Sequence, residues 1–182
     1  MDFELDDHGF SWVGTCKLPS WAGYLDRSGA YGGAGDRQHS DGSVEIVFAP
    51  EGRDASPLTP AERSSVQWLL DNQSDVSEAV KAAIFRQYPE LQAIDGNPPA
   101  GTSPHMPPLT SPEDLKGLIG LYAINVHQIS KAGSPYLGFE FGCTWDDDHG
   151  LGVLMHGLEV VEVGGSDTAR LLWIAKRHAG EA

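Results

Sequence analysis

The chain has 182 residues, of which 26 are Asp or Glu and 12 are Lys or Arg, so its formal net charge is −14. Because phosphate backbones and anionic lipids repel such a charge, nucleic acid and membrane surfaces are excluded as expected partners, and a basic partner is favoured. Hydrophobic residues make up 40% of the chain, which favours a folded core over disorder, and no apolar run is long enough to span a membrane.

The size and the cysteine content bear on organisation and compartment. A chain of this length is typical of one domain, so we expect a single domain over residues 1–182. Cys16 and Cys143 are too few for a disulfide framework and do not have the spacing of a zinc site. The acidic start of the chain lacks the apolar core of a signal peptide. These features predict a cytoplasmic protein.

The N-terminal part, residues 1–57, predicts β-strands. Polar and apolar residues alternate at the start, so three acidic side chains share one face of the first strand: Asp2, Glu4 and Asp6. Residues 10–18 and 44–48 have the composition of two further strands, and a glycine-rich loop over 26–43 joins them.

The middle part, residues 58–92, predicts a helical hairpin. Thr59-Pro60-Ala61-Glu62 combines a capping box with proline at the first helical position. Apolar residues then recur at helical spacing, with a break near 71–74, so two helices are expected, the second ending before Pro89. The helix residues expected in the core are Val66, Leu69, Leu70, Val80 and Ile84. A proline-rich connection is expected over residues 93–111.

The C-terminal part, residues 112–182, is mainly β in pattern. Alternation predicts strands near 121–127 and 136–141, and two more joined by a tight turn at His156-Gly157. Ser166 is expected to cap a closing helix. Because strands and crossover helices do not alternate, the sequence predicts an α+β fold, with a largely antiparallel sheet and the two-helix hairpin packed on one face. Further core positions are expected at Trp12, Phe139, Phe141 and Val153.

The most distinctive polar run contains four neighbouring candidates: Asp146, Asp147, Asp148 and His149. Clustered carboxylates and an imidazole suit a metal ion, so a metal-dependent hydrolase using Asp146, Asp148, His149 and also His156 is an alternative function. Successive residues of an extended chain point to opposite faces, however, so few of these ligands converge. We therefore favour a hairpin tip with an acidic surface available to a partner, and expect no metal and no cofactor.

Other reactive residues carry weaker signals. His127 and His156 are candidates for acid–base work with Glu140, but the spacing does not place them together. Cys143 lacks the local signature of a nucleophile, and the glycines at 164–165 lack the lysine of a phosphate-binding loop. No catalytic residue is expected.

The tract over residues 135–153, which contains the acidic run and continues through 160–169, resembles the signature of an uncharacterised family of bacterial domains. The stretch after Thr59 and the Trp12-Val13-Gly14 opening are also similar. Members of that family are acidic and cytoplasmic, and often resemble immunity proteins of polymorphic or contact-dependent toxin systems.

The resemblance implies an immunity protein that binds and neutralises a cognate, basic toxin effector, such as a nuclease or another secreted effector. It brings no catalytic motif. The candidate partner-binding residues are Asp146, Asp147, Asp148 and His149 at the tip, and Asp2, Glu4 and Asp6 near the N-terminus. An interaction module for a different partner is a further alternative. The oligomeric state is left open.

Overall fold

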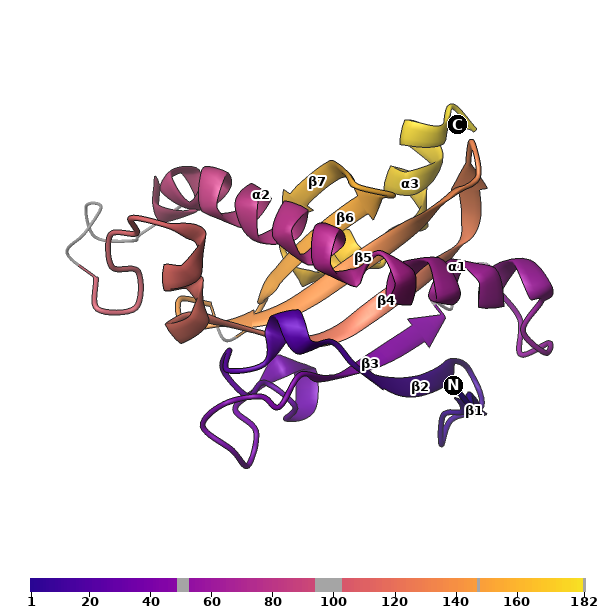
Figure 1. Ribbon diagram of the computed structural model, residues 1–182, viewed down its shortest axis with the longest axis horizontal. Helices are drawn as coiled ribbons and strands as arrows, with labels where there is room; N and C mark the ends of the chain where they lie inside the picture. Colours follow the sequence, from indigo (N-terminus) through magenta and orange to yellow (C-terminus); the bar gives the residue numbers. More distant parts are fainter. Residues whose placement is uncertain (49–52, 94–102, 147, 182) are drawn as a thin grey trace.

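The computed structural model describes residues 1–48, 53–93, 103–146 and 148–181. Its centre is a seven-stranded sheet in which the strands follow one another in chain order, from β1 to β7 (Figure 1). Neighbouring strands are antiparallel except β3 and β4, which are parallel. The strands are β1 (Glu4–Leu5), β2 (Trp12–Lys17), β3 (Ser43–Phe48), β4 (Ile119–Lys131), β5 (Ser134–Cys143), β6 (Leu151–His156) and β7 (Glu159–Gly164). The expected α+β class with a largely antiparallel sheet is confirmed.

Two long helices connect β3 to β4 and cover the first face of the sheet. These are α1 (Pro60–Asp71) and α2 (Gln73–Ala93). A crossover of this length is what allows the two strands to run parallel. Only Asn72 separates the helices, and they lie end to end across the sheet instead of folding back side by side as a hairpin (Figure 1).

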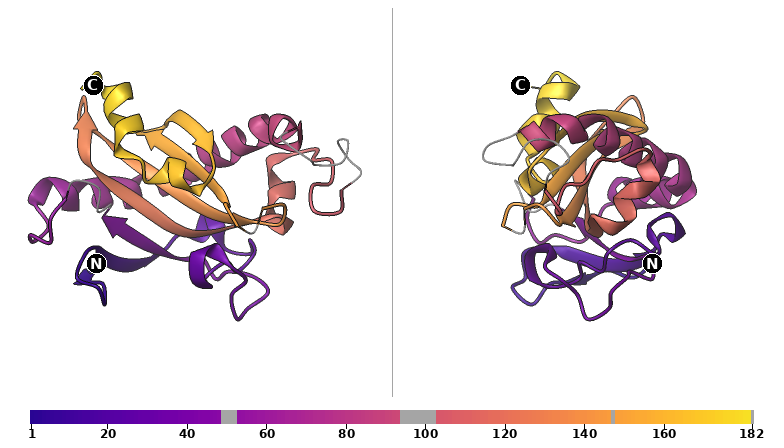
Figure 2. Two further views of the ribbon diagram at one scale, coloured as in Figure 1. Left: turned by 180° about the vertical axis from the view of Figure 1, so that it is seen from behind. Right: turned by 90° about the vertical axis from the view of Figure 1, so that its left-hand side faces the viewer.

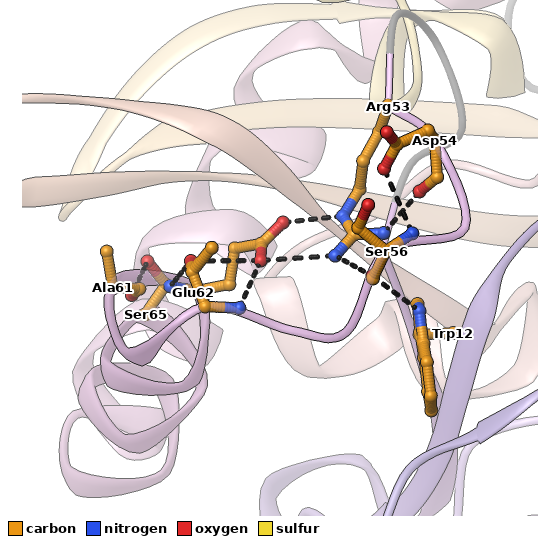
Figure 3. Close-up of polar contacts among 8 residues, drawn as sticks. Trp12, Arg53, Asp54, Ser56, Ala61, Glu62 and Ser65 are labelled. Carbon is orange, nitrogen blue, oxygen red and sulfur yellow. Dashed lines mark hydrogen bonds and ion pairs between the residues drawn. The ribbon is translucent and has the colours of Figure 1, made fainter.

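The start of α1 has the predicted capping box. Thr59 Oγ1 accepts a hydrogen bond from the Glu62 backbone N–H, and the Glu62 carboxylate accepts one from the Thr59 N–H. Arg53 adds two hydrogen bonds to that carboxylate, and Trp12 Nε1 donates to the carbonyl of Ser56 in the segment between them (Figure 3). The helix start is therefore tied to the loop before it and to β2.

The end of α2 differs from the prediction. The helix continues through Pro89, which is exposed, to Ala93. On the buried side, Tyr88 Oη donates to the carbonyl oxygen of Pro107 at 2.9 Å and Gln92 Nε2 to that of Met106 at 2.9 Å. These tertiary contacts offset the backbone hydrogen bond that a proline removes. Of the predicted connection over 93–111, residues 94–102 lie outside the described residues.

The main core lies between the two long helices and the first face of the sheet. Val66, Leu69, Val80, Ile84, Phe139, Phe141 and Val153 are buried as predicted. Leu70 and Trp12 are only half-buried and pack at the margin of this core. None of the helices in the described ranges is long and apolar enough to cross a membrane.

The second face of the sheet carries the short helix α3 (Leu172–Ala179), preceded by the 3-10 helix η4 (Ser166–Ala169) (Figure 2). The single closing helix expected after Ser166 is therefore divided in two. The prediction that Ser166 caps this helix is also wrong, because Gly165 occupies the N-cap position of η4. Trp173, in α3, is half-exposed. α3 packs with Leu154 and Tyr136 in a second, smaller core.

Two glycines of β5 allow other segments to lie directly on this second face. A Cβ atom at Gly138 would overlap the carbonyl oxygen of Ala169 in η4. A Cβ atom at Gly142 would overlap the carbonyl oxygen of Gly32, in the 3-10 helix η2 (Ala30–Gly32) of the glycine-rich loop. Because glycine has no side chain, both backbones come close to the strand. The two segments leave part of the sheet surface open between them.

Candidate functional site

A groove of about 530 Å³ lies on the second face of the sheet, over β2, β3 and β4. Its floor follows from strand alternation, because Val44 and Ile46 point into the main core and Glu45 therefore points to the opposite face. The register places Thr15, Glu45, Ala123 and Glu140 in one row across four neighbouring strands. The glycine-rich loop and Arg170, the residue after η4, also line the groove.

Glu140 lies at one end of this row and is almost completely buried, at 4% exposure. Tyr122 Oη donates to its carboxylate at 2.7 Å, Asn125 Nδ2 donates to the other oxygen, and Arg170 Nε lies 3.4 Å away. Burial, and then the hydrogen bond to Glu140, raise the pKa of Tyr122. A buried charge requires such partners, so Glu140 is held in place by its surroundings.

The histidines weighed for acid–base chemistry do not contact Glu140; each lies against a backbone carbonyl, and His156 Nδ1 also lies 3.8 Å from the exposed carboxylate of Glu159. Nε2 of His127 lies 3.0 Å from the carbonyl oxygen of Ala169, and Nε2 of His156 lies 2.9 Å from that of Lys131. Cys143 is buried, and burial raises the pKa of its thiol to about 11. A thiol that stays protonated near neutral pH is a poor nucleophile. The structure therefore does not bring His127, His156 and Glu140 together as a catalytic group.

Asp26 fixes the loop wall of the groove. Its carboxylate accepts hydrogen bonds from the backbone N–H of Ser28 at 3.1 Å, and from both the N–H and the Nε of Arg37, at 3.1 and 3.3 Å. Burial by itself would raise the pKa of Asp26, but the hydrogen bonds from Ser28 and Arg37 outweigh it and lower the pKa. The loop is therefore anchored by an ionised carboxylate.

Glu45 differs from the other charged groups of the groove. It is exposed, and it makes no hydrogen bond or ion pair with any residue in the described part of the chain. Its neighbours in the row are the neutral side chains of Thr15 and Ala123. Glu45 thus places an uncompensated negative charge on the floor of the groove.

The acidic tip between β5 and β6 is closed by its own hydrogen bonds. Asp146 Oδ1 accepts from the backbone N–H of Asp148 at 3.2 Å and of His149 at 2.9 Å, and lies 3.1 Å from His149 Nδ1. Asp148 and His149 are exposed, whereas Asp147 lies outside the described residues. The carbonyl of His149 accepts from Ser166 N–H at 3.0 Å, which ties the tip to η4.

The N-terminal acids form a separate group. Asp2 and Glu4 are exposed at the edge of the sheet. Asp6 accepts a hydrogen bond from the Phe10 N–H at 2.8 Å, which closes the turn before β2 and lowers the pKa of Asp6. β2, β3 and β4 separate this edge from β5, so the structure does not bring these acids and the tip together (Figure 1).

Comparison with protein families gives one match. The model of the family described as "Domain of unknown function (DUF6985)" matches residues 35–171, which is most of the chain. The chain belongs to this family. Comparisons with curated proteins and with solved structures gave no match. The matched DUF6985 segment contains Glu45, Glu140 and the acidic tip, whereas Asp2, Glu4 and Asp6 precede it.

Sequence reasoning missed the groove of this DUF6985 protein. The strand over 44–48 was predicted, and alternation alone places Glu45 on the face opposite Val44 and Ile46. The sequence contains no signal, however, that puts this strand beside β4, since the two are joined by a long crossover and their register depends on its packing. Glu45 was therefore not among the predicted site residues.

Proposed function

We propose that this DUF6985 protein is a cytoplasmic binding protein of the immunity type, which neutralises a basic toxin effector by covering part of its surface. The observation that carries the proposal is the charge: the net charge is −14, and many of the basic side chains are already paired with carboxylates of the same chain. Such pairs within the chain include Lys17–Asp41, Arg37–Asp26, Arg53–Glu62, Lys116–Glu113, Arg170–Glu140 and Arg177–Glu162. The remaining carboxylates leave a negative field available to a cationic partner.

Such a field acts mainly on the encounter. Complementary charges steer two proteins together and raise the association rate to about 10⁸–10⁹ M⁻¹s⁻¹ at low salt. A nuclease would offer a suitable surface, because its own site must attract phosphates. Among the expected contact residues, Asp148, His149, Asp2 and Glu4 are exposed and available for this role.

A metal-dependent hydrolase fits the geometry less well. Asp146 is one of the ligands in that alternative, but its carboxylate accepts hydrogen bonds from two backbone N–H groups of its own turn. Across residues 1–48, 53–93, 103–146 and 148–181, no group of three His, Cys, Asp or Glu side chains is arranged to hold a metal ion. The tip therefore contributes an exposed surface more readily than a coordination site.

Co-expression with the product of the adjacent gene tests the proposal. We expect this protein to restore growth to cells that express a toxic neighbour, and to form a complex with it that survives size-exclusion chromatography. The association rate should fall steeply between about 0.05 M and about 0.5 M salt, as the screening length shortens. A neighbour that remains toxic and forms no complex would refute the proposal.

A further inference from the structure

The groove on the second face holds a single carboxylate without a partner in the described structure, and this points to a specific ligand. We propose that Glu45 anchors an arginine side chain of the partner protein, which enters the groove between the glycine-rich loop and Arg170. The inference rests on the proposed function for the identity of the partner as a basic protein. It goes further by naming the place and the chemistry of one contact.

The position of Glu45 is the first argument. β3 is an interior strand, paired with β2 on one side and β4 on the other, so the side chain cannot turn around a sheet edge to a distant cation. Thr15 and Ala123 flank it across the strands, and neither carries a charge. Cross-strand neighbours of opposite charge normally stabilise a charged residue on a sheet. At Glu45 neither cross-strand neighbour is a cation, and the side chain faces the groove.

The charge balance of the groove is the second argument. Arg37 contacts Asp26 at 3.3 Å and also lies 3.2 Å from Asp41. Arg170 lies 3.4 Å from Glu140 and 3.5 Å from Asp167. Each lining arginine thus already contacts two carboxylates, and a ligand that brings one positive charge would complete the pairing at Glu45.

The size and rigidity of the groove are the third argument. At about 530 Å³ it falls within the range of small-molecule sites, so it can admit an arginine side chain with part of its backbone. The Asp26 hydrogen bonds hold one wall, and the close contact of η4 with Gly138 holds the other. A preformed site loses little conformational entropy when a ligand binds.

Arginine suits this carboxylate better than lysine does. The guanidinium is planar and donates two parallel hydrogen bonds to one carboxylate, whereas the lysine ammonium acts as a strongly hydrated point charge. The exposed hydroxyl of Thr15 lies in the same row and offers a further acceptor. An arginine in the groove would therefore find a bidentate partner and an adjacent hydroxyl.

Titration with N-acetyl-L-arginine amide, followed by amide NMR shifts of the full chain, tests the site without knowledge of the partner. We expect saturable shifts at Thr15, Glu45 and Ala123, and none with the neutral citrulline analogue. Glu45→Gln should weaken binding about two- to fivefold, since it removes only the charge of an exposed carboxylate. Glu78→Gln removes the same charge from an exposed position on α2, on the other side of the sheet, and should leave binding unchanged.

Shifts spread evenly over exposed acids, or equal affinities for Glu45→Gln and wild type, would overturn the inference. Because Glu45 is exposed, the variant should fold normally, which its melting temperature will verify. The two proposals fail separately. If the protein binds its toxin but Glu45→Gln and Glu78→Gln weaken the complex equally, the groove is wrong and the proposed function stands. If the arginine amide binds in the groove but no toxin is neutralised, the groove site stands and the proposed function is wrong.

Discussion

Replacing Glu62 with Gln tests whether the ion pair at the start of α1 stabilises the fold. The side chains of Arg53 and Glu62 are 11% and 10% exposed, and Arg53 Nε lies 2.6 Å from the carboxylate (Figure 3). Glutamine retains an acceptor for the capping N–H of Thr59 but removes the opposite charge that the guanidinium of Arg53 contacts. Removing one partner of a buried pair costs about 3–5 kcal/mol. Arg53 keeps the carbonyls of Asp54 and Ser56 as acceptors, so we expect the lower end of this range, about 3 kcal/mol.

The pH dependence of this loss gives a sharper test. Burial raises the pKa of Glu62, but the hydrogen bonds from Arg53 and Thr59 outweigh it and lower the pKa below that of the unfolded chain. The stabilisation is therefore fully present above the unfolded pKa of about 4.3, and is lost as the pH falls through the lower folded value. Glu62→Gln lacks this titration, so the difference between the two proteins should shrink in acid.

Urea unfolding followed by tryptophan fluorescence measures the difference at each pH, provided that the slope with denaturant is unchanged. Glu78→Gln, an exposed change on α2, serves as the control and should shift stability by less than about 0.5 kcal/mol. A difference for Glu62→Gln that stays below about 1 kcal/mol near neutral pH, or that is equal at all pH values, would refute the reasoning.

Three further outcomes are expected. Ile84→Ala should lower the free energy of unfolding by about 2–5 kcal/mol, because this side chain is fully buried between α2 and the sheet; a smaller loss in urea unfolding would contradict that packing. Gly138→Ala should displace η4, since its methyl group would overlap a carbonyl oxygen there, and amide hydrogen exchange should become faster in η4 while α1 keeps its protection. Asp146→Ala should lower the melting temperature by removing the acceptor of the tip turn, whereas Asp148→Ala, at an exposed position, should leave it nearly unchanged and slow association with the toxin. Equal melting temperatures for the two tip variants would count against the internal role of Asp146.

Local signals in the sequence were sufficient where local contacts decide the structure. The start of α1 was predictable because both halves of the capping box lie within Thr59–Glu62. The end of α2 was not, because Tyr88 and Gln92 donate to carbonyls of Pro107 and Met106 in the connection after the helix, contacts that helical spacing does not reveal. The expectation that a helix ends before proline applies to an isolated helix, and tertiary contacts override it here.

The tip was predictable only in part. Turn-forming residues and strand alternation located it between two strands, and Asp148 and His149 are exposed as an acidic surface requires. The sequence could not indicate that Asp146 would accept hydrogen bonds from its own turn, since the same three aspartates suit a solvated surface and a closed turn equally well. Only the backbone conformation of the tip distinguishes a solvated surface from a closed turn.

The tract that carries the family resemblance contributes more to the groove than its acidic run suggests. Gly138 and Gly142 let η4 and the glycine-rich loop approach β5, and Glu140 between them supplies the buried charge that Arg170 contacts. Because all three lie on the same side of the strand, one alternating segment both shapes the open surface and holds part of its wall. Glu45 arrives from a strand far away in sequence, through a parallel pairing that the crossover helices make possible. A search for function in this fold is therefore better directed at the residues that face the groove than at the run of aspartates beside it.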